Sequence, residues 1–341
     1  MTLRGSTQPL SAAYDAALVD LDGVVYIGGR PVQAAPVALA KARATGMATA
    51  FVTNNASRTP AAIAERLTDL GIVTLTDEVV TSAQAGAQLL AERLPRGAPV
   101  LVVGDMGLRM AVHRHGLRPV TSARETPHAV IQGYSSRLAH DALREACLAM
   151  NGSPTELPFI ATNGDTTVPT GRGPGPGNGS FSRVIAAATG HEPLVAGKPH
   201  RPLHDLGAAR TAAHHPIVVG DRLDTDILGA HRRGSDSLLV LSGVTTPTEL
   251  VLAEPELRPS YISADLSGLT QPHPVCESGP QATAHCGGWT VRLADGKPTV
   301  HGGGNTLDGV RALCSAVWAD AAPPPTPAAV REVLGQLGQL G

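Results

Sequence analysis

Short apolar runs alternate with helical segments in the amino-terminal part of the chain, and this alternation limits the folds that it can adopt. The runs at residues 18–25 and 47–52 are too short for helices and predict strands. Residues 35–45 and 60–70 are rich in helix-forming residues, and a glycine follows each segment. Strand, helix, strand and helix joined by short links predict a parallel, doubly wound α/β sheet.

The same alternation restarts at about residue 82 and predicts a second α/β part. We expect helices at residues 83–94, 108–115 and 139–150, and strands at residues 100–103, 129–131 and 159–161. Residues 171–179 are mostly glycine and proline, and they predict a hinge loop without regular structure. The second part is therefore predicted to be inserted into the first, as a lid would be.

The first alternation resumes beyond the hinge loop, with helices expected at 181–189 and 227–233 and strands at 216–219 and 238–241. We predict a doubly wound, Rossmann-like parallel-sheet core with an inserted α/β cap domain and a small C-terminal α+β extension. The predicted bounds are 1–81 and 173–268 for the core domain, 82–172 for the cap domain, 269–284 for a linker and 285–341 for the C-terminal domain.

The C-terminal domain is expected to contain a hairpin and two helices. Alternating runs flank Asp295-Gly296, a common two-residue hairpin turn, and helices are expected at 307–318 and 328–340. The glycine-rich turn at 302–305 precedes the first helix and could hold an anion at its amino end. This part resembles a fragment of an acyltransferase. We expect it to pack on the core or to mediate assembly, for example of a homodimer.

Composition and charge exclude several classes of partner. The 341 residues exceed what one hydrophobic core usually holds. The formal net charge of -2 argues against a nucleic-acid partner, and no apolar run is long enough for a membrane span or a signal peptide. The cysteines, Cys147, Cys276, Cys286 and Cys314, fit reduced thiols in the cytoplasm better than a disulfide framework. The spacing of Cys276, His285 and Cys286 fits no standard metal site.

Two carboxylates, Asp20 and Asp22, stand in the first apolar run, just before a glycine. In a strand, residues two apart point to the same side. Two carboxylates on one buried face need a cation or a shared proton between them. The alternative is a strand end with two solvated acids before a turn. The pair therefore predicts a metal site, a proton exchange, or both, and other segments have to decide.

Three further polar segments stand after a predicted strand or at a helix start. Thr53 and Asn54 follow the second strand, Lys198 lies between glycine and proline, and Asp221 follows a later strand with Asp226 five residues on. Ligands gather at the carboxyl ends of strands in a doubly wound sheet, so these groups can converge. Taken singly, Thr53-Asn54 is more often a turn, Asp221 a helix cap and Lys198 a solvated side chain. Their joint presence favours a catalytic site.

The four segments together resemble the four motifs of the haloacid dehalogenase-like (HAD) phosphatases. They are Asp20-Leu21-Asp22-Gly23-Val24, Thr53-Asn54-Asn55, Gly197-Lys198-Pro199 and Gly220-Asp221-Arg222-Leu223-Asp224-Thr225-Asp226-Ile227. The resemblance covers residues 14–268 and is to the p-nitrophenylphosphatase-like branch, in which an α/β cap lies between the second and third motifs. It implies a Mg²⁺-dependent phosphoric monoester hydrolase that acts on a small phosphorylated metabolite. Within this branch the fourth motif is similar to that of phosphoglycolate and glycerol-phosphate phosphatases.

The resemblance implies distinct roles for the carboxylates. Asp20 would attack phosphorus and form an aspartyl-phosphate, and Asp22 would protonate the leaving alkoxide and then deprotonate water. Mg²⁺ would be bound by Asp20, the main-chain carbonyl of Asp22 and Asp221. Asp226 would orient the water ligands of the metal.

The resemblance also implies a phosphate-binding set and a range of substrates. Thr53 and the amide of Asn54 would bind phosphate oxygens, while Lys198 would offset their charge. Glycerol 3-phosphate is the favoured substrate, and phosphoglycolate, pyridoxal 5'-phosphate and a nucleotide are alternatives. A phosphate-binding regulatory protein without turnover would not need Asp22 as an acid. Dehalogenation needs no metal, so Asp22 and Asp221 would be superfluous.

In the cap, Ala161-Thr162-Asn163-Gly164-Asp165 resembles the family's cap motif, so Asn163 and Asp165 are expected to shape the entrance. Arg172 could meet an anionic substrate, and the alternative is a solvated side chain. Residues 133–136 depart from the family pattern, because they lack the acidic residue that this branch often carries after the glycine.

Two segments look like motifs but are predicted to have no catalytic role. Gly104-Asp105 also follows an apolar strand, but residue 110, five positions on, is Met, so we interpret Asp105 as part of a helix-cap turn. Gly296-Lys297-Pro298 repeats the Gly-Lys-Pro triplet but lies in the predicted hairpin turn.

Overall fold

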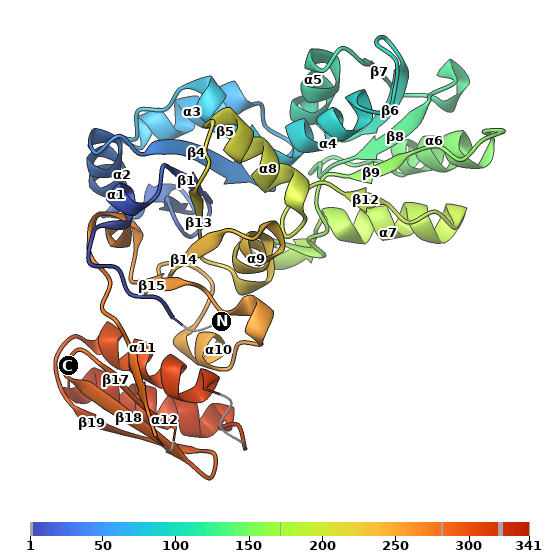
Figure 1. The fold of residues 1–341 in the computed structure, drawn as a ribbon. Helices are drawn as coiled ribbons and strands as arrows, with labels where there is room; N and C mark the ends of the chain where they lie inside the picture. Colours follow the sequence, from blue (N-terminus) through green and yellow to red (C-terminus); the bar gives the residue numbers. More distant parts are fainter. Residues whose placement is uncertain (1–2, 171, 281, 320–322, 341) are drawn as a thin grey trace. The chain divides into compact units, whose positions relative to one another are not determined.

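The computed structural model describes residues 3–170, 172–280, 282–319 and 323–340. Figure 1 labels the helices and strands along the ribbon. The chain divides into two compact units. The first consists of residues 1–49 and 211–341, and the second of residues 50–210.

The first unit contains four parallel strands in the order β15-β14-β13-β1. Their bounds are Ala16–Val19 (β1), Pro216–Gly220 (β13), Asp236–Val240 (β14) and Tyr261–Ser263 (β15). The helices of this part are Leu10–Ala13 (α1), Ala35–Ala44 (α2), Leu228–Arg233 (α9) and Pro247–Val251 (α10). All residues of β1 and β13 are buried, as the continuous apolar runs of a parallel sheet require.

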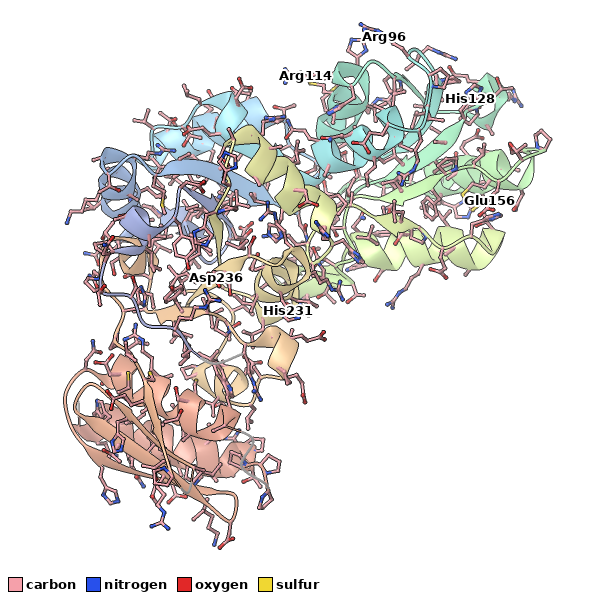
Figure 2. All side chains as sticks on the ribbon, in the orientation of Figure 1. Arg96, Arg114, His128, Glu156, His231 and Asp236 are labelled. Atoms are coloured by element: carbon pink, nitrogen blue, oxygen red, sulfur yellow. The ribbon has the colours of Figure 1, made fainter. Side chains whose placement is uncertain are left out.

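The amino-terminal segment is held against this sheet by polar contacts to β14. Asp236, the first residue of β14 (Figure 2), accepts hydrogen bonds from Tyr14 Oη at 2.8 Å and from Arg4 at 2.6 Å. Tyr14 is buried, and its ring contacts the edge of Tyr261 on β15. The start of the chain is therefore fixed beside β14, the neighbour of the strand β13 that Asp221 follows.

The second unit contains the parallel pair β4–β5 and a five-stranded parallel sheet in the order β12-β9-β8-β6-β7. The strands are Ala48–Thr53 (β4), Val79–Thr81 (β5), Pro99–Val103 (β6), Arg118–Val120 (β7), Ala129–Gln132 (β8), Phe159–Ala161 (β9) and Leu194–Val195 (β12). The first two residues of β4 belong to the first unit. The helices are Pro60–Asp69 (α3), Ser82–Ala91 (α4), Met106–Arg114 (α5), His140–Asn151 (α6), Asn178–Thr189 (α7) and Arg201–Arg210 (α8). These α/β elements confirm the predicted fold class, while the predicted domain bounds stay a prediction.

The first predicted strand was too long. The run 18–25 was expected to be one strand, but β1 ends at Val19. The N–H of Asp20 still donates to Val219 O at 2.8 Å, and the chain then turns so that the N–H of Val25 returns to Leu21 O. Apolar content alone does not separate a strand from a buried turn. Tyr26–Ile27 (β2) and Arg30–Pro31 (β3) follow as a short hairpin.

The prediction of a hinge loop over 171–179 was also wrong for the residues that the structure describes; Gly171 lies outside them. Thr167–Thr170 (β10) and Gly173–Pro176 (β11) form an antiparallel hairpin, and α7 begins at Asn178. Each strand of this two-stranded sheet has a free edge, where a proline costs no ladder hydrogen bond. Local glycine and proline content therefore did not prevent pairing.

The C-terminal residues form a four-stranded antiparallel sheet in the order β16-β17-β18-β19. Its elements are Glu277–Gly279 (β16), Thr283–Cys286 (β17), Trp289–Ala294 (β18), Lys297–Gly302 (β19), Thr306–Trp318 (α11) and Pro327–Leu340 (α12). The predicted hairpin is confirmed, since Asp295 and Gly296 both have positive φ, 48° and 71°. β16 lies within the stretch that was predicted to be a linker.

This extension packs on the parallel sheet of the first unit through one hydrophobic cluster. Buried Trp289 and Leu313 belong to the same cluster as Leu239 and Ile262 of β14 and β15. Trp318 Nε1 also donates to the backbone carbonyl of Val251 in α10 at 3.0 Å. The extension and the sheet thus share a core.

Short helices of other types connect the longer elements. They are the 3-10 helices Thr76–Glu78 (η1), Ala123–Glu125 (η2), Pro255–Leu257 (η4) and Leu266–Thr270 (η5), and the π-helix Leu223–Ile227 (η3). None of the helices in the described part of the chain is long and apolar enough to cross a membrane.

Candidate active site

Three carboxylates meet at the carboxyl ends of β1 and β13 in the first unit. Asp20 follows β1, Asp221 follows β13, and Asp226 lies in the π-helix η3. One carboxylate oxygen from each lies within 4.8 Å of the others. Asp221 is fully buried and Asp226 is 1% exposed. Carboxylates this close and this buried repel one another unless a cation lies between them, and their oxygens suit a hard divalent ion.

The Asp221 carboxylate is fixed by backbone that approaches it closely. Its Oδ2 accepts the N–H of Val244 at 2.7 Å, from the loop after β14. A Cβ at Gly243 or at Gly23 would overlap this same oxygen. The two glycines therefore allow the loops after β14 and β1 to close around the carboxylate.

The π-helix η3 directs Asp226 back toward the end of β13. Asp226 Oδ2 accepts the N–H of Arg222 at 3.1 Å, and the side chain packs against Gly220. The guanidinium of Arg222 instead binds the exposed Asp224 at 3.0 and 2.8 Å. A π-turn places one extra residue in a helical turn, and such turns recur at functional sites. Here it separates Asp226, in the cluster, from Asp224, outside it.

Asp22 lies in the loop after β1, and its exposed side chain is outside the three-carboxylate cluster. The loop is fixed by the N–H of Gly23, which donates to Tyr26 O at 2.8 Å, and by Ser242 Oγ, which donates to Gly23 O at 2.7 Å. Because β1 ends before Asp20, the two acids do not share a strand face. An exposed carboxylate on a fixed loop can exchange protons, whereas the buried carboxylates suit cation binding.

In the second unit, Asn54 at the end of β4 binds the segment that contains Lys198. Asn54 Oδ1 accepts the N–H of Lys198 at 2.8 Å, and its Nδ2 donates to Lys198 O at 3.1 Å. The Lys198 side chain is 4% exposed, and its Nζ donates to Val52 O at 3.3 Å. The structure thus places Lys198 next to β4, which ends at Thr53, and next to Asn54, which follows it.

The cap-motif residues belong to the same hydrogen-bonded group. Asn163 Nδ2 donates to the backbone carbonyl of Asn54 at 2.8 Å, and Asp165 Oδ2 accepts from Asn54 Nδ2 at 3.2 Å. Arg172 is exposed in the turn between β10 and β11, where its N–H donates to Thr170 Oγ1. Asn163 and Asp165 therefore hold the loop after β4, a role that the sequence did not indicate.

Several supporting residues were not found from the sequence. Gly243 and Val244 hold Asp221, and Ser82 Oγ donates to Asn54 O at 2.7 Å. Each follows the carboxyl end of a parallel strand, β14 or β5, which is where ligands gather in such sheets. The same positional rule that selected Asp221 would have selected them.

The look-alike segments occupy structural positions. Asp105 stands at the amino end of α5, and its Oδ1 accepts from Ser135 Oγ at 2.7 Å. Lys297 begins β19 and is exposed. His285 contacts Thr290 Oγ1 at 2.9 Å. Within the residues that the structure describes, the only metal-competent acidic or histidine–cysteine group is the one at Asp221.

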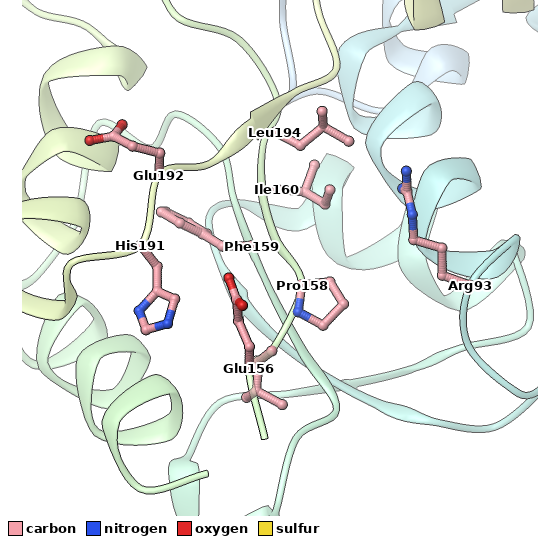
Figure 3. A pocket seen from close by; sticks show the side chains of 9 residues that line it. Arg93, Glu156, Pro158, Phe159, Ile160, His191, Glu192 and Leu194 are labelled. Carbon is pink, nitrogen blue, oxygen red and sulfur yellow. The ribbon is translucent and has the colours of Figure 1, made fainter. Parts of the chain in front are cut away.

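The second unit also contains a pocket of about 350 Å³ beside β9 and β12 (Figure 3). Acidic, basic and apolar side chains line it together, among them Arg93, Glu156, Phe159, His191 and Glu192. None of the predicted site residues lines this pocket.

Comparison with known proteins decides the family. Residues 17–118 match the family model of haloacid dehalogenase-like hydrolases, and residues 195–269 match an HAD-hydrolase-like model. The chain is 41% identical over 318 residues to D-glycerol 3-phosphate phosphatase from Mycobacterium tuberculosis, over 91% of this chain and 87% of the relative. The chain belongs to the haloacid dehalogenase-like hydrolases. This confirms the predicted family and the predicted class of enzyme.

Further relatives of this HAD chain include 5'-nucleotidase YutF from Bacillus subtilis, 35% identical over 68% of this chain and 89% of the relative. Among solved structures, glycerol phosphate phosphatase from Mycobacterium tuberculosis in complex with magnesium has a TM-score of 0.84 and 39% identity, and the match covers 98% of this chain and 99% of that chain. Residues 286–339 match a GCN5-related N-acetyltransferase-like domain, in agreement with the acyltransferase resemblance of the extension.

Proposed function

We propose that this HAD hydrolase is a Mg²⁺-dependent phosphatase that hydrolyses glycerol 3-phosphate through an aspartyl-phosphate on Asp20. The observation that carries the proposal is the cluster of Asp20, Asp221 and Asp226 at the ends of β1 and β13. The choice of substrate is supported by similarity to D-glycerol 3-phosphate phosphatase over 91% of the chain.

The donor set of the cluster fits a magnesium ion. The three carboxylate oxygens lie within 4.8 Å of one another, Asp221 and Asp226 are buried, and carboxylate oxygens are the hard ligands that Mg²⁺ prefers. We assign the ion to Asp20, Asp221 and the main-chain carbonyl of Asp22, with Asp226 orienting its water ligands. When bound, Mg²⁺ offsets the charge of the carboxylates and of the substrate phosphate.

Asp20 and Asp22 divide the chemistry between them. An Asp20 carboxylate oxygen attacks phosphorus while the bond from phosphorus to the glycerol oxygen breaks, and protonated Asp22 donates its proton to that oxygen. Asp22, now ionised, accepts a proton from the water that attacks the aspartyl-phosphate. Inorganic phosphate leaves, and Asp20 returns as a carboxylate. The exposed position of Asp22 supports this exchange of protons.

The phosphate group is assigned to Thr53, Asn54 and Lys198. The Thr53 hydroxyl and the N–H of Asn54 donate to phosphate oxygens, and the Lys198 ammonium offsets their charge. The hydrogen bonds between Asn54 and Lys198 support a common role, because they fix the two segments to each other. Asn163 and Asp165 maintain this arrangement, and Arg172 at its exposed turn meets the anionic substrate.

A 5'-nucleotide is the second candidate substrate, because 5'-nucleotidase YutF is also similar over 68% of this chain. Phosphoglycolate and pyridoxal 5'-phosphate are weaker candidates.

We extend the proposal to a cytoplasmic location, which the four free cysteines support. A homodimer stays a prediction, and sedimentation of the purified protein would test it.

Phosphate release from a panel of phosphorylated metabolites tests the proposed function. The panel contains glycerol 3-phosphate, a 5'-nucleotide, phosphoglycolate and pyridoxal 5'-phosphate, each measured with Mg²⁺ and with excess chelator. We expect the highest kcat/KM for glycerol 3-phosphate and no turnover without the metal. If kcat/KM is higher for the nucleotide than for glycerol 3-phosphate, the nucleotide is the substrate instead. Full activity in the presence of excess chelator would reject the metal assignment.

A further inference from the structure

A chain of buried amide side chains runs through the second unit to the loop after β4. Gln132 on β8 donates from Nε2 to Asn178 Oδ1 at 2.8 Å. Asn178, the first residue of α7, donates from Nδ2 to the backbone carbonyl of Asn163 at 2.8 Å. Asn163 then donates to the carbonyl of Asn54 at 2.8 Å. The first three side chains are 0%, 1% and 5% exposed, so water does not compete for these bonds.

The chain of amides ends on the peptide between Asn54 and Asn55, which is held at both of its polar groups. The carbonyl of Asn54 also accepts from Ser82 Oγ at 2.7 Å. The N–H of Asn55 donates to Thr53 Oγ1 at 3.1 Å. Rotation of this peptide would break three hydrogen bonds at once, so the position of Asn163 determines the position of this N–H.

This peptide determines what the Thr53 hydroxyl can do. Thr53 Oγ1 already accepts a hydrogen bond from Asn55, so its own hydrogen has to point elsewhere. Within the described part of the chain, no acceptor for that hydrogen is found. Thr53 is 3% exposed, and a buried donor without an acceptor costs free energy that a phosphate oxygen would recover. The hydrogen bond that Thr53 Oγ1 accepts from the N–H of Asn55 also polarises the hydroxyl and makes it a stronger donor.

We propose that Gln132 and Asn178 are positioning residues that act through Asn163 to fix the Asn54–Asn55 peptide, so that the Thr53 hydroxyl donates to the substrate phosphate. The inference rests on the proposed function in one respect, the role of Thr53 as a phosphate ligand. Both side chains are buried, and neither is assigned to bind the phosphate.

Gln132→Met separates this role from a structural one. Methionine is similar in length and removes the bond to Asn178. Among the residues that the structure describes, Gln132 Oε1 has no hydrogen-bond partner that would also be lost. A structural role predicts a change in unfolding temperature without a specific effect on phosphate. The positioning role predicts that the protein stays folded but binds phosphate about tenfold more weakly, since small displacements of a ligand-binding group are costly.

The experiment measures the Kd of inorganic phosphate by calorimetry on the full chain with Mg²⁺, in a double-mutant cycle with Thr53→Val. We expect Gln132→Met to weaken binding about tenfold in the parent and in Thr53→Ser, which keeps the hydroxyl, but not in Thr53→Val. Ser182→Ala is the matched control, because this buried hydroxyl on α7 bonds only Gly179 O locally at 3.0 Å. It should leave the Kd unchanged.

The outcomes distinguish this inference from the proposed function. Equal losses in all three Thr53 backgrounds, no loss in the parent, or no effect of Thr53→Val itself would overturn the inference. A parent protein that binds phosphate through Thr53 but does not hydrolyse glycerol 3-phosphate would reject the proposed function and leave the inference standing. If Gln132→Met does not fold, Asn178→Asp replaces it, with binding expected to recover at low pH, where a protonated carboxyl can again donate to Asn163.

Discussion

At the residue scale, Asp20 is the group on which the proposed chemistry depends. Asp20→Asn keeps the shape of the side chain but removes the nucleophile and one negative charge of the cluster. We expect kcat for glycerol 3-phosphate to fall at least about a thousandfold, as for other covalent nucleophiles. The assay is phosphate release at saturating substrate and Mg²⁺. Asp224→Asn is the control, because Asp224 is an exposed partner of Arg222, and it should keep near-normal kcat. Comparable kcat in both variants would show that Asp20 is not the nucleophile.

Gly243 tests whether the backbone around Asp221 determines metal binding. In Gly243→Ala the added methyl group would overlap Asp221 Oδ2, so the carboxylate has to move. We expect the Mg²⁺ concentration for half-maximal activity to rise about 10- to 100-fold, the usual effect of disturbing a group that supports a metal ligand. Gly29→Ala is the control, because a Cβ there meets no atom within 4 Å. An unchanged Mg²⁺ dependence would show that this close approach does not matter.

The sequence predicted the acidic residues for a reason that was only partly correct. Asp20 and Asp22 were expected on one strand face, yet β1 ends at Val19 and only Asp20 joins Asp221. The position of Asp20 after a parallel strand was the sound part of the argument, because strand ends converge regardless of side-chain alternation. The residues that fix Asp221 could not be found by motif, since Val244 contributes only its backbone N–H.

At the element scale, His273 links the segment after η5 to the amino-terminal segment. Its backbone pairs with Ser6, and its ring nitrogen Nε2 donates to Gly268 O at 2.8 Å. The ring is 4% exposed and lies against Tyr261. Burial disfavours the imidazolium and lowers the pKa of His273 below its ordinary value of 6.5, although the bond to Gly268 opposes this shift.

The lowered pKa of His273 predicts how stability depends on pH. The unfolded chain takes up a proton near pH 6.5, while the folded chain does so only at lower pH. Stability is therefore fully present above pH 6.5 and is lost as pH falls toward the folded pKa, by at most about 1.4 kcal/mol per pH unit. Urea unfolding between pH 7.5 and 5.5 measures this loss. His273→Gln keeps an N–H for Gly268 and should lose less stability over the same interval; identical slopes would contradict the assignment.

The elements that were mispredicted share a physical cause. The hinge loop was predicted from glycine and proline, but β10 and β11 pair with each other and α7 begins at Asn178. Pairing between short segments is a tertiary effect that local composition does not encode. The helices with regular periodicity, such as Ala35–Ala44 and Pro60–Asp69, were predicted to within a residue or two because their signals are local.

At the scale of the whole molecule, the C-terminal extension contributes to the core of the first unit. Its buried residues and those of β14 and β15 form one cluster, although they are far apart in the sequence. No periodic pattern indicates which distant surface a helix or sheet will cover, so the sequence suggested packing on the core only as one of two options. We therefore expect substitutions in the core of the extension to lower the free energy of unfolding without changing kcat.

Trp289→Ala tests this separation. The side chain is 1% exposed, belongs to the shared cluster, and donates from Nε1 to Asn305 O at 2.8 Å. Its removal should lower the free energy of unfolding by about 3–5 kcal/mol, as for other buried aromatic residues. Because the residue lies in the extension and not among the acidic residues, kcat for glycerol 3-phosphate at 25 °C should stay within about twofold of the parent. Urea unfolding and phosphate release measure the two quantities on the same preparation.

His301→Ala, exposed on β19, is the control and should change neither the free energy of unfolding nor kcat. A folded Trp289→Ala protein with kcat reduced tenfold or more would instead show that the extension takes part in catalysis.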